Sequence, residues 1–444
     1  MISTVFKNKF LFICIHILLG VLVIYIPISK LYTLITIIGG IFLIYRNKNK
    51  NEEALYFAGY IVGTEVFIRM SGGLLVYETG KYGLIIFTLL GLIMGPIKHK
   101  SSVSILFYVF LLLLGIIFTE VPPGESIRNA VAFNLSGPIA LGVFALYCYK
   151  RTIKVSQLKE LLFISLLPIF SIISYLYFRT PNLEEMVFGT ASNFKTSGGF
   201  GPNQVATILG FGAFILAVFF LIKVKLARFI IIDAFFLIYF TYRCLLTFSR
   251  GGLFTAAIAF ILFAFYMFLY KKITLAKITK YIFVTFLLFL GIWLYTSNIT
   301  GGMIANRYAN KNAAGVEKDD ISAGRGDIIN TQLESFLESP FFGIGVGNGR
   351  FKRMESNQKI TAASHNELGR LIEEHGLMGI IALIILLILS LENIYISNNY
   401  QRAFLTAFFI FWFLTINHTA MRIAFPAFAY SLSLIRITEN DKYE

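Results

Sequence analysis

The sequence predicts an all-α, polytopic integral membrane protein with about 12–14 transmembrane helices and one large loop on the outer side of the membrane. Hydrophobic residues make up 57% of the 444 residues and charged residues only 14%, whereas about 25% of the residues of soluble proteins are charged. The mean hydropathy is +0.74, and 46 Phe and 23 Tyr residues are spread through repeated apolar runs. These observations exclude a water-soluble protein.

Fourteen apolar runs are candidates for transmembrane helices, since each covers all or most of about 30 Å of hydrocarbon. Three of them, 31–45, 402–416 and 422–437, are short, so a pair of runs could be re-entrant and the number of spans could be twelve. The first run has signal-like flanks but lacks a clear small-residue cleavage site, and we expect a retained helix. In order, the predicted spans are 10–28, 31–45, 53–70, 82–97, 103–119, 129–149, 157–178, 203–222, 229–248, 252–270, 281–297, 376–396, 402–416 and 422–437.

Positive charge marks alternate gaps between these spans. Because basic loops stay on the cytoplasmic side, both termini are predicted to be cytoplasmic and the long segment 298–375 to lie outside. That segment holds nine Lys or Arg and ten Asp or Glu residues, so it contributes −1 to the net charge of +15, and nucleic-acid binding is not indicated. The basic residues gather at 7–9, 46–50, 98–100, 150–159, 223–228, 271–280 and 402.

The chain divides into three predicted parts. Residues 1–297 form transmembrane helices with short loops, residues 298–375 form the large outer loop, and residues 376–444 form the C-terminal transmembrane helices and a cytoplasmic tail. The cytoplasmic loops are short and rich in Lys, which is enough to orient the chain but too little to build a site. The outer side instead collects Gly, Asn, Arg and His, so we expect the chemistry there.

The outer loop contains two recognisable elements. Apolar residues recur at helical spacing over 328–337, with Glu334 and Glu338 on the other side, which predicts an amphipathic helix on the membrane surface that ends at Pro340. The glycine-rich run 341–349 follows. It lacks the spacing of a dinucleotide-binding loop and no parallel-sheet pattern surrounds it, so it predicts a structural turn.

The run Ser364-His365-Asn366-Glu367 has the spacing of a capping box, with Ser364 as the N-cap and Glu367 at the third helical position. His365 would then be the first residue of a helix. The positive end of the helix dipole disfavours an imidazolium ion there, which suits a neutral general base, and it attracts anions such as phosphate. Asn366 beside it is a candidate for substrate binding. The alternative is that His365 lies at a solvated helix start.

Three outer arginines are candidates for binding a phosphate group. Arg243 and Arg250 flank the outer end of one predicted span, and their spacing of seven residues, two helical turns, means that they could share one helical face. Arg325 lies in the loop run Ala323-Gly324-Arg325-Gly326-Asp327. A planar guanidinium binds phosphate in bidentate fashion. The alternative is that Arg243 and Arg250 anchor the outer interface and that Arg325 is a solvated charge.

The three cysteines and the remaining histidines give weaker indications of a functional site. Cys14, Cys148 and Cys244 are odd in number and lie in or beside separate hydrophobic segments, so no disulfide framework follows. No HExxH pattern or cysteine pair occurs, and we expect neither a metal site nor a cofactor. His418 and Arg422, near the end of a late span, are weaker candidates for supporting a site.

Several segments, taken in order, resemble the O-antigen ligase and O-antigen polymerase superfamily of polytopic membrane glycosyltransferases. The likeness covers roughly 200–380, and outside it only the hydropathy matches. Each motif alone is weak, but three in order on one membrane face are fairly specific. The segments are Gly201-Pro202-Asn203, Phe248-Ser249-Arg250-Gly251-Gly252, Gly324-Arg325-Gly326-Asp327 leading to Ser339-Pro340-Phe341-Phe342-Gly343-Ile344-Gly345-Val346-Gly347, and Ser364-His365-Asn366-Glu367 through Glu374-His375-Gly376-Leu377-Met378-Gly379.

The resemblance implies a GT-C-like enzyme of the bacterial inner membrane. Its donor would be a glycan on undecaprenyl diphosphate, and transfer to an acceptor hydroxyl would be metal-independent and periplasmic. By position, His365 matches the catalytic histidine, Arg250 an arginine expected to hold the diphosphate, and Arg325 a further essential arginine. Asn203 belongs to the matching Pro-Asn segment and is a candidate for substrate binding, whereas Arg243 matches no motif. The expected partners are the lipid-linked donor, a glycan or lipid A core acceptor, the bilayer and a polysaccharide chain-length regulator.

The resemblance leaves the acceptor open. A polymerase adds to another lipid-linked repeat unit, and a ligase adds to lipid A core or protein. We favour a polymerase of O-antigen or of capsular or exopolysaccharide repeat units, since nothing indicates a dedicated lipid A core or protein-binding domain. A transporter of lipid-linked glycans is a further alternative, but the paired half-helices or internal repeats typical of transporters are not seen.

Overall fold

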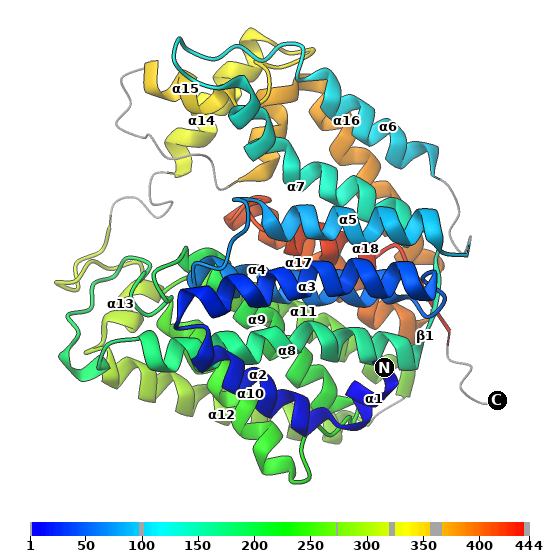
Figure 1. Cartoon of the computed structure of the whole chain (residues 1–444). Helices are drawn as coiled ribbons and strands as arrows, with labels where there is room; N and C mark the ends of the chain where they lie inside the picture. Colours follow the sequence, from blue (N-terminus) through cyan, green and yellow to red (C-terminus); the bar gives the residue numbers. More distant parts are fainter. Residues whose placement is uncertain (1, 97–101, 272–273, 319–324, 356–365, 439–444) are drawn as a thin grey trace.

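The computed structural model describes residues 2–96, 102–271, 274–318, 325–355 and 366–438. Within these ranges the chain forms helices α1 to α18 and one pair of short strands (Figure 1). The elements are α1 (Ile2–Lys7), α2 (Lys9–Leu22), α3 (Ile26–Asn47), α4 (Glu53–Met70), α5 (Thr79–Met94), α6 (Val103–Leu114), α7 (Ile127–Cys148), β1 (Thr152–Lys154), α8 (Val155–Arg179), η1 (Leu183–Glu185), α9 (Pro202–Leu221), α10 (Ile230–Leu246), α11 (Arg250–Lys271), α12 (Leu275–Ile299), α13 (Met303–Tyr308), α14 (Arg325–Glu338), α15 (Asn348–Glu355), α16 (Glu367–Ile396), α17 (Asn399–His418), α18 (Phe425–Leu432) and β2 (Arg436–Thr438).

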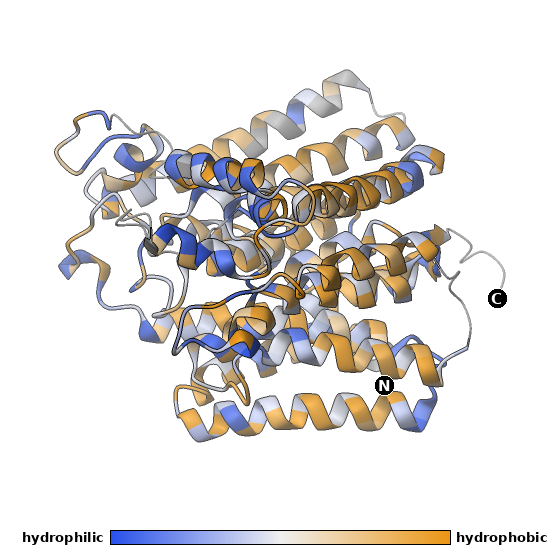
Figure 2. Cartoon of the chain, turned by 90° about the horizontal axis from the view of Figure 1, so that it is seen from above, coloured by the Kyte–Doolittle hydropathy of each residue, from blue (hydrophilic) through white to orange (hydrophobic). Residues whose placement is uncertain are grey.

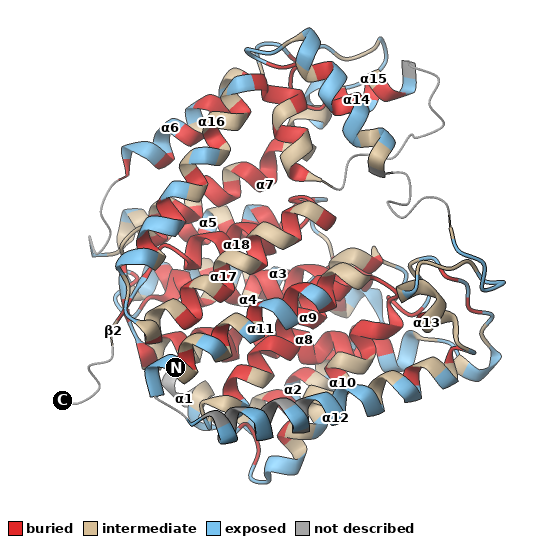
Figure 3. Ribbon diagram, turned by 180° about the vertical axis from the view of Figure 1, so that it is seen from behind, coloured by how far each residue is buried: buried red, intermediate tan, exposed pale blue. Residues whose placement is uncertain are grey.

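The helices form a bundle whose centre is apolar and whose outer helices also expose apolar residues. Hydrophobic residues run along the helices, while hydrophilic residues gather at the helix ends and loops (Figure 2). Helices α4, α8, α9 and α18 are buried along most of their length, whereas α12 is largely exposed (Figure 3). An exposed apolar surface of this extent suits a lipid environment.

Six of the described helices are long and apolar enough to cross a membrane. They are α3, α7, α8, α9, α11 and α16. The prediction of an all-α, polytopic membrane protein is confirmed.

The last predicted span, 422–437, is wrong as a continuous helix. Only Phe425–Leu432 is helical, about 12 Å long at 1.5 Å per residue, and the chain then reaches β2, which pairs in parallel with β1. Irregular backbone at membrane depth needs partners inside the protein. Asn393 of α16 supplies them, because its amide nitrogen donates to the carbonyl oxygens of Ser433 (2.8 Å) and Ile435 (3.0 Å).

The other end of α18 is held by a buried carboxylate of α4. Oε2 of Glu65 accepts a hydrogen bond from the backbone N–H of Ala424, at 2.6 Å. Oε1 of the same residue is 3.0 Å from the guanidinium of Arg69, which is also buried. A negative charge at a helix N-terminus is favourable, so this carboxylate both caps α18 and balances the charge of Arg69.

The segment 298–375, predicted to be an outer loop, contains α13, α14, α15 and the first part of α16. The amphipathic helix predicted for 328–337 is confirmed as α14. It packs through its polar side, on which Thr331, Gln332 and Ser335 are buried, while Leu333 and Leu337 on its apolar side are exposed. This orientation agrees with a helix that lies on the membrane surface.

The glycine-rich run is a turn that docks on a kink in α16. Gly343 has φ +71°, and Gly376 has φ +58° and ψ −136°, which interrupts the helical conformation of α16. The backbone N–H of Leu377 donates to the carbonyl of Pro340 at 2.7 Å, and that of Ile344 to the carbonyl of Glu373 at 3.0 Å. The predicted structural turn is therefore confirmed, and it braces the outer part of α16.

We expect Gly376→Ala to lower the free energy of unfolding by about 1–3 kcal/mol, the usual cost of a residue held in a sparsely populated backbone region. A Cβ at this position would lie 2.6 Å from the backbone nitrogen of Gly343 and from the carbonyl oxygen of Pro340. The measurement is thermal unfolding of the purified protein in detergent. Gly39→Ala is the control, because its Cβ would meet nothing within 4 Å. Equal melting temperatures for Gly376→Ala and wild type would contradict a constrained kink.

Candidate active site

Two of the predicted motifs meet at the N-terminal ends of α9 and α11. Pro202 is the first residue of α9, a position that suits proline, and Asn203 follows it. The hydroxyl of Ser249 donates to Oδ1 of Asn203 at 2.8 Å, although the residues are 46 positions apart. A Cβ at Gly252 would lie 2.3 Å from the backbone of Ala206, so the two helices touch backbone to backbone.

His418, at the C-terminal end of α17, completes this junction. Its Nε2 lies 3.1 Å from the hydroxyl of Thr207, and its carbonyl accepts from the amide of Asn203 at 3.4 Å. A Cβ at Gly251 would lie 2.5 Å from the ring of His418, so the glycine makes room for the histidine. From its position in sequence alone, His418 was only a weak candidate. Its link to Asn203 spans 215 positions, and no local pattern encodes it.

Arg250 is the first residue of α11 and is half-buried. In the part of the chain that the structure describes, no carboxylate pairs with its guanidinium. Two positive charges lie near the phenol of Tyr308. Burial, the larger effect, raises the pKa of Tyr308, and the charges of Arg250 and Arg307 partly offset the rise.

Arg307, on α13, was missed by the sequence analysis. Its Nε donates to the carbonyl of Phe248 at 3.3 Å, which places the side chain beside the turn that leads into α11. Phe248 itself has φ +58°. No local sequence motif identifies Arg307, because its contact with Phe248 joins residues 59 positions apart and depends on how α13 packs beside the start of α11.

The prediction that Arg243 and Arg250 share one helical face is wrong. Helix α10 ends at Leu246, and a turn through Phe248 separates it from α11, so the two arginines lie on different helices. Arg243 is only 3% exposed, and its guanidinium donates to the hydroxyl of Thr180, at the end of α8, at 2.7 Å. Its role in substrate binding stays a prediction.

The predicted capping box is wrong in its register. Helix α16 begins at Glu367, and Asn366 is the N-cap: its Oδ1 accepts from the backbone N–H groups of Leu368 (3.0 Å) and Gly369 (3.4 Å). Asn caps a helix as well as Ser does. The carboxylate of Glu367 instead pairs with Arg370, and both are buried. The substrate-binding role of Asn366 stays a prediction.

His365 lies outside the described residues, as does Ser364. The described chain resumes at Asn366, the N-cap of α16.

A buried ion pair ties the outer helices together. The guanidinium of Arg353, on α15, lies 3.0 and 3.1 Å from the two carboxylate oxygens of Glu373, on α16. The amide of Gln332, on α14, donates to the same carboxylate at 3.3 Å. Arg325 is the first residue of α14, and of this residue only the backbone is described. The carboxylate of Glu373 therefore joins α14, which begins at Arg325, to α15 and α16.

The described residues contain no cluster of metal-binding side chains. Among those residues, no three His, Cys, Asp or Glu side chains come together in a way that would hold a metal ion.

Part of the chain matches a known protein family. Residues 234–384 match the family described as O-antigen ligase. The matched range contains Arg243, Arg250, Arg325 and His365, whereas Asn203 lies before it. A search of curated proteins finds no match. Residues 234–384 therefore form a domain similar to the O-antigen ligase family, within a polytopic all-α architecture, and this supports membership of the O-antigen ligase and polymerase family.

Proposed function

We propose that this membrane enzyme transfers a glycan from undecaprenyl diphosphate to an acceptor hydroxyl on the periplasmic side of the inner membrane. The observation that carries the proposal is the position of Arg250. Its guanidinium lies at the N-terminus of α11, where the helix dipole is also positive, and no described carboxylate balances it. Such a site attracts an anion, and the diphosphate of the donor supplies one.

The reaction needs a base and a means of stabilising the leaving group. In the proposed step His365 takes the proton of the acceptor hydroxyl while the acceptor oxygen forms a bond to the anomeric carbon. The bond between that carbon and the diphosphate oxygen breaks, and undecaprenyl diphosphate leaves with the electron pair. Arg250 and Arg325 stabilise the negative charge that develops on the diphosphate.

The surrounding residues support these roles in different ways. Asn203 lies beside Arg250 through the hydrogen bond from Ser249, so it is placed to contact the same ligand. Asn366 fixes the start of α16 directly after His365. The clamp at Glu373 holds α14, which begins at Arg325, and α15 against α16.

The side of the membrane is inferred from charge. The basic gaps, including 150–159 and 223–228, favour a cytoplasmic location for those loops and a periplasmic one for 298–375. Figure 1 shows α13, α14 and α15 at the end of the bundle away from α1 and β1, as this topology requires.

We propose a polymerase, with O-antigen or with capsular or exopolysaccharide repeat units as substrates and a chain-length regulator as a partner. The same residues could serve a ligase with lipid A core or a protein as acceptor. The acceptor therefore has to be tested directly.

The deciding experiment is a transfer assay with the purified protein in lipid nanodiscs and a defined undecaprenyl-diphosphate-linked repeat unit. We expect a ladder of products with successive repeat units when the acceptor is a second lipid-linked unit, and release of undecaprenyl diphosphate. Products only with lipid A core would identify a ligase. In sealed liposomes, movement of the donor across the membrane without any transfer would identify a transporter.

A further inference from the structure

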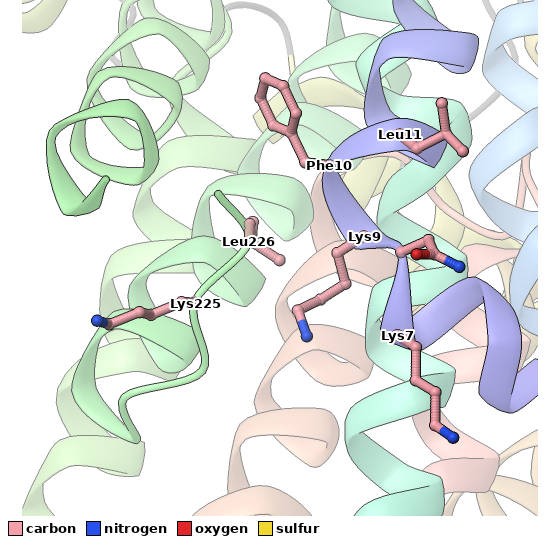
Figure 4. Close-up of a pocket in the computed structure, with 7 residues that line it drawn as sticks. Lys7, Lys9, Phe10, Leu11, Lys225 and Leu226 are labelled. Carbon is pink, nitrogen blue, oxygen red and sulfur yellow. The ribbon is translucent and has the colours of Figure 1, made fainter. Parts of the chain in front are cut away.

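A basic pocket lies at the other end of the bundle, between the start of α2 and the chain that joins α9 to α10 (Figure 4). Its volume is about 350 Å³. It is on the side of the molecule where Figure 1 shows α1, away from the outer helices α13 to α15. The lining residues are Lys7, Asn8, Lys9, Phe10, Leu11, Lys225 and Leu226.

Lys9 is the central cation of this pocket. Figure 4 shows its side chain directed into the opening between the two segments, with Lys7 and Lys225 on either side and extending outward. Its ammonium group donates to the carbonyl of Phe6 at 3.1 Å and lies 4.2 Å from the centre of the Phe6 ring. These contacts hold the charge at the mouth of the pocket and leave it without an acidic hydrogen-bond partner among the described residues.

The acidic group that acts on Lys9 is already engaged in hydrogen bonds. Asp233, on α10, acts electrostatically on Lys9. Its two carboxylate oxygens accept hydrogen bonds from the backbone N–H groups of Leu226 (3.0 Å) and Ala227 (2.9 Å), so its main effect is to shape the chain that forms one wall. Three ammonium groups against one carboxylate leave the pocket positively charged.

The pocket also has an apolar side that faces outward. Phe10 and Leu11 are both exposed, as are Phe229, Ile230 and Ile231 at the start of α10. Exposed apolar residues at the end of membrane helices face lipid rather than water. A ligand in this position would therefore have an anionic group at the lysines and hydrocarbon beside Phe10 and Leu11.

We propose that this pocket binds the phosphate of an anionic phospholipid in the leaflet opposite to the proposed active site. Lysine binds phosphate as a point charge that does not require a fixed fork geometry, and basic pockets between membrane helices bind phospholipid head groups in this way. Free phosphate would satisfy the lysines but not the apolar wall. The proposal concerns how the protein binds lipid and does not depend on the reaction proposed above.

The test is lipid binding by the full-length protein, delipidated and returned to phosphatidylcholine nanodiscs. Phosphatidylglycerol is titrated in, and the lipid that stays bound is measured by native mass spectrometry. We expect the wild type to prefer phosphatidylglycerol over phosphatidylcholine, and the double variant Lys9→Gln/Lys225→Gln to bind phosphatidylglycerol about 10- to 30-fold more weakly, from the loss of two basic residues near the membrane surface.

The matched control is Lys48→Gln/Lys50→Gln, which removes the same charge from exposed lysines in another predicted cytoplasmic loop. It should bind phosphatidylglycerol like the wild type. Equal losses in both double variants would show general attraction to the membrane and overturn the proposal. Displacement of the lipid by inorganic phosphate at comparable concentration would overturn it too, since the pocket would then bind the anion alone. Melting temperatures in phosphatidylcholine confirm that both variants are folded.

Discussion

His365→Ala should reduce the initial rate of glycan transfer by about 10²- to 10⁴-fold, the usual contribution of a general base. Affinity for the lipid-linked donor should change little, because Arg250 and Arg325 are proposed to hold the diphosphate. His365→Gln should be as poor as His365→Ala, since an amide cannot take up the proton of the acceptor hydroxyl. Initial rates are measured across pH with saturating donor, together with donor affinity for each variant.

The control is His99→Ala, which removes a histidine from a predicted cytoplasmic loop and should leave the rate unchanged. Recovery of much of the activity in His365→Gln would indicate that the histidine only orients the substrate by hydrogen bonding. A rate for His365→Ala within a few-fold of the wild type would rule out His365 as the general base. The alternative, a histidine at a solvated helix start, would then hold.

Arg250→Lys should lower kcat/KM by about 10- to 100-fold, although the positive charge is kept. One hydrogen bond to a charged group contributes about 1.5–3 kcal/mol, and lysine cannot reproduce the two parallel bonds that a guanidinium makes to a phosphate. Arg250→Ala should lose more, because the charge is lost as well. The measurement is the rate of transfer as donor concentration is varied, with donor binding determined separately.

Arg128→Lys makes the same chemical change at an exposed position at the start of α7, and it should behave like the wild type. Both lysine variants should reach the membrane in normal amounts, since neither residue makes an ion pair within the described chain. Full turnover by Arg250→Lys would show that this arginine is an anchor at the membrane interface and would remove the main support for a bound diphosphate.

The fold was largely predictable because hydropathy and charge act locally. Helix α4 covers Glu53–Met70, and the predicted span was 53–70. The amphipathic pattern of 328–337 predicted α14 correctly for the same reason. Hydropathy could not predict that α18 is short, because the residues after it are equally apolar and its length is set by distant partners on α4 and α16.

The site was predictable only in part. The Arg250 motif was located correctly at the start of a helix. The capping box was wrong in register: Ser364 and Asn366 are both good N-cap residues, and in the structure Asn366 is the cap and Glu367 pairs with Arg370. The junction with His418 depends on a contact between helices far apart in sequence. Local patterns in a single sequence cannot predict contacts between helices that are far apart along the chain.

The cap on α18 also orders the assembly of the molecule in time. Glu65 and Ala424 are 359 positions apart, so α4 is made and inserted long before its partner exists. Until then one oxygen of Glu65 already has Arg69, and the other has no backbone N–H of α18 to accept. The pairing of β1 with β2 waits for the same late segment. Because folding during synthesis generally proceeds from the N-terminus, these two contacts form only after the C-terminal segment has emerged. A chain cut short after α17 would contain Arg250, Arg325 and His365 but would lack the partners of Glu65 and of β1.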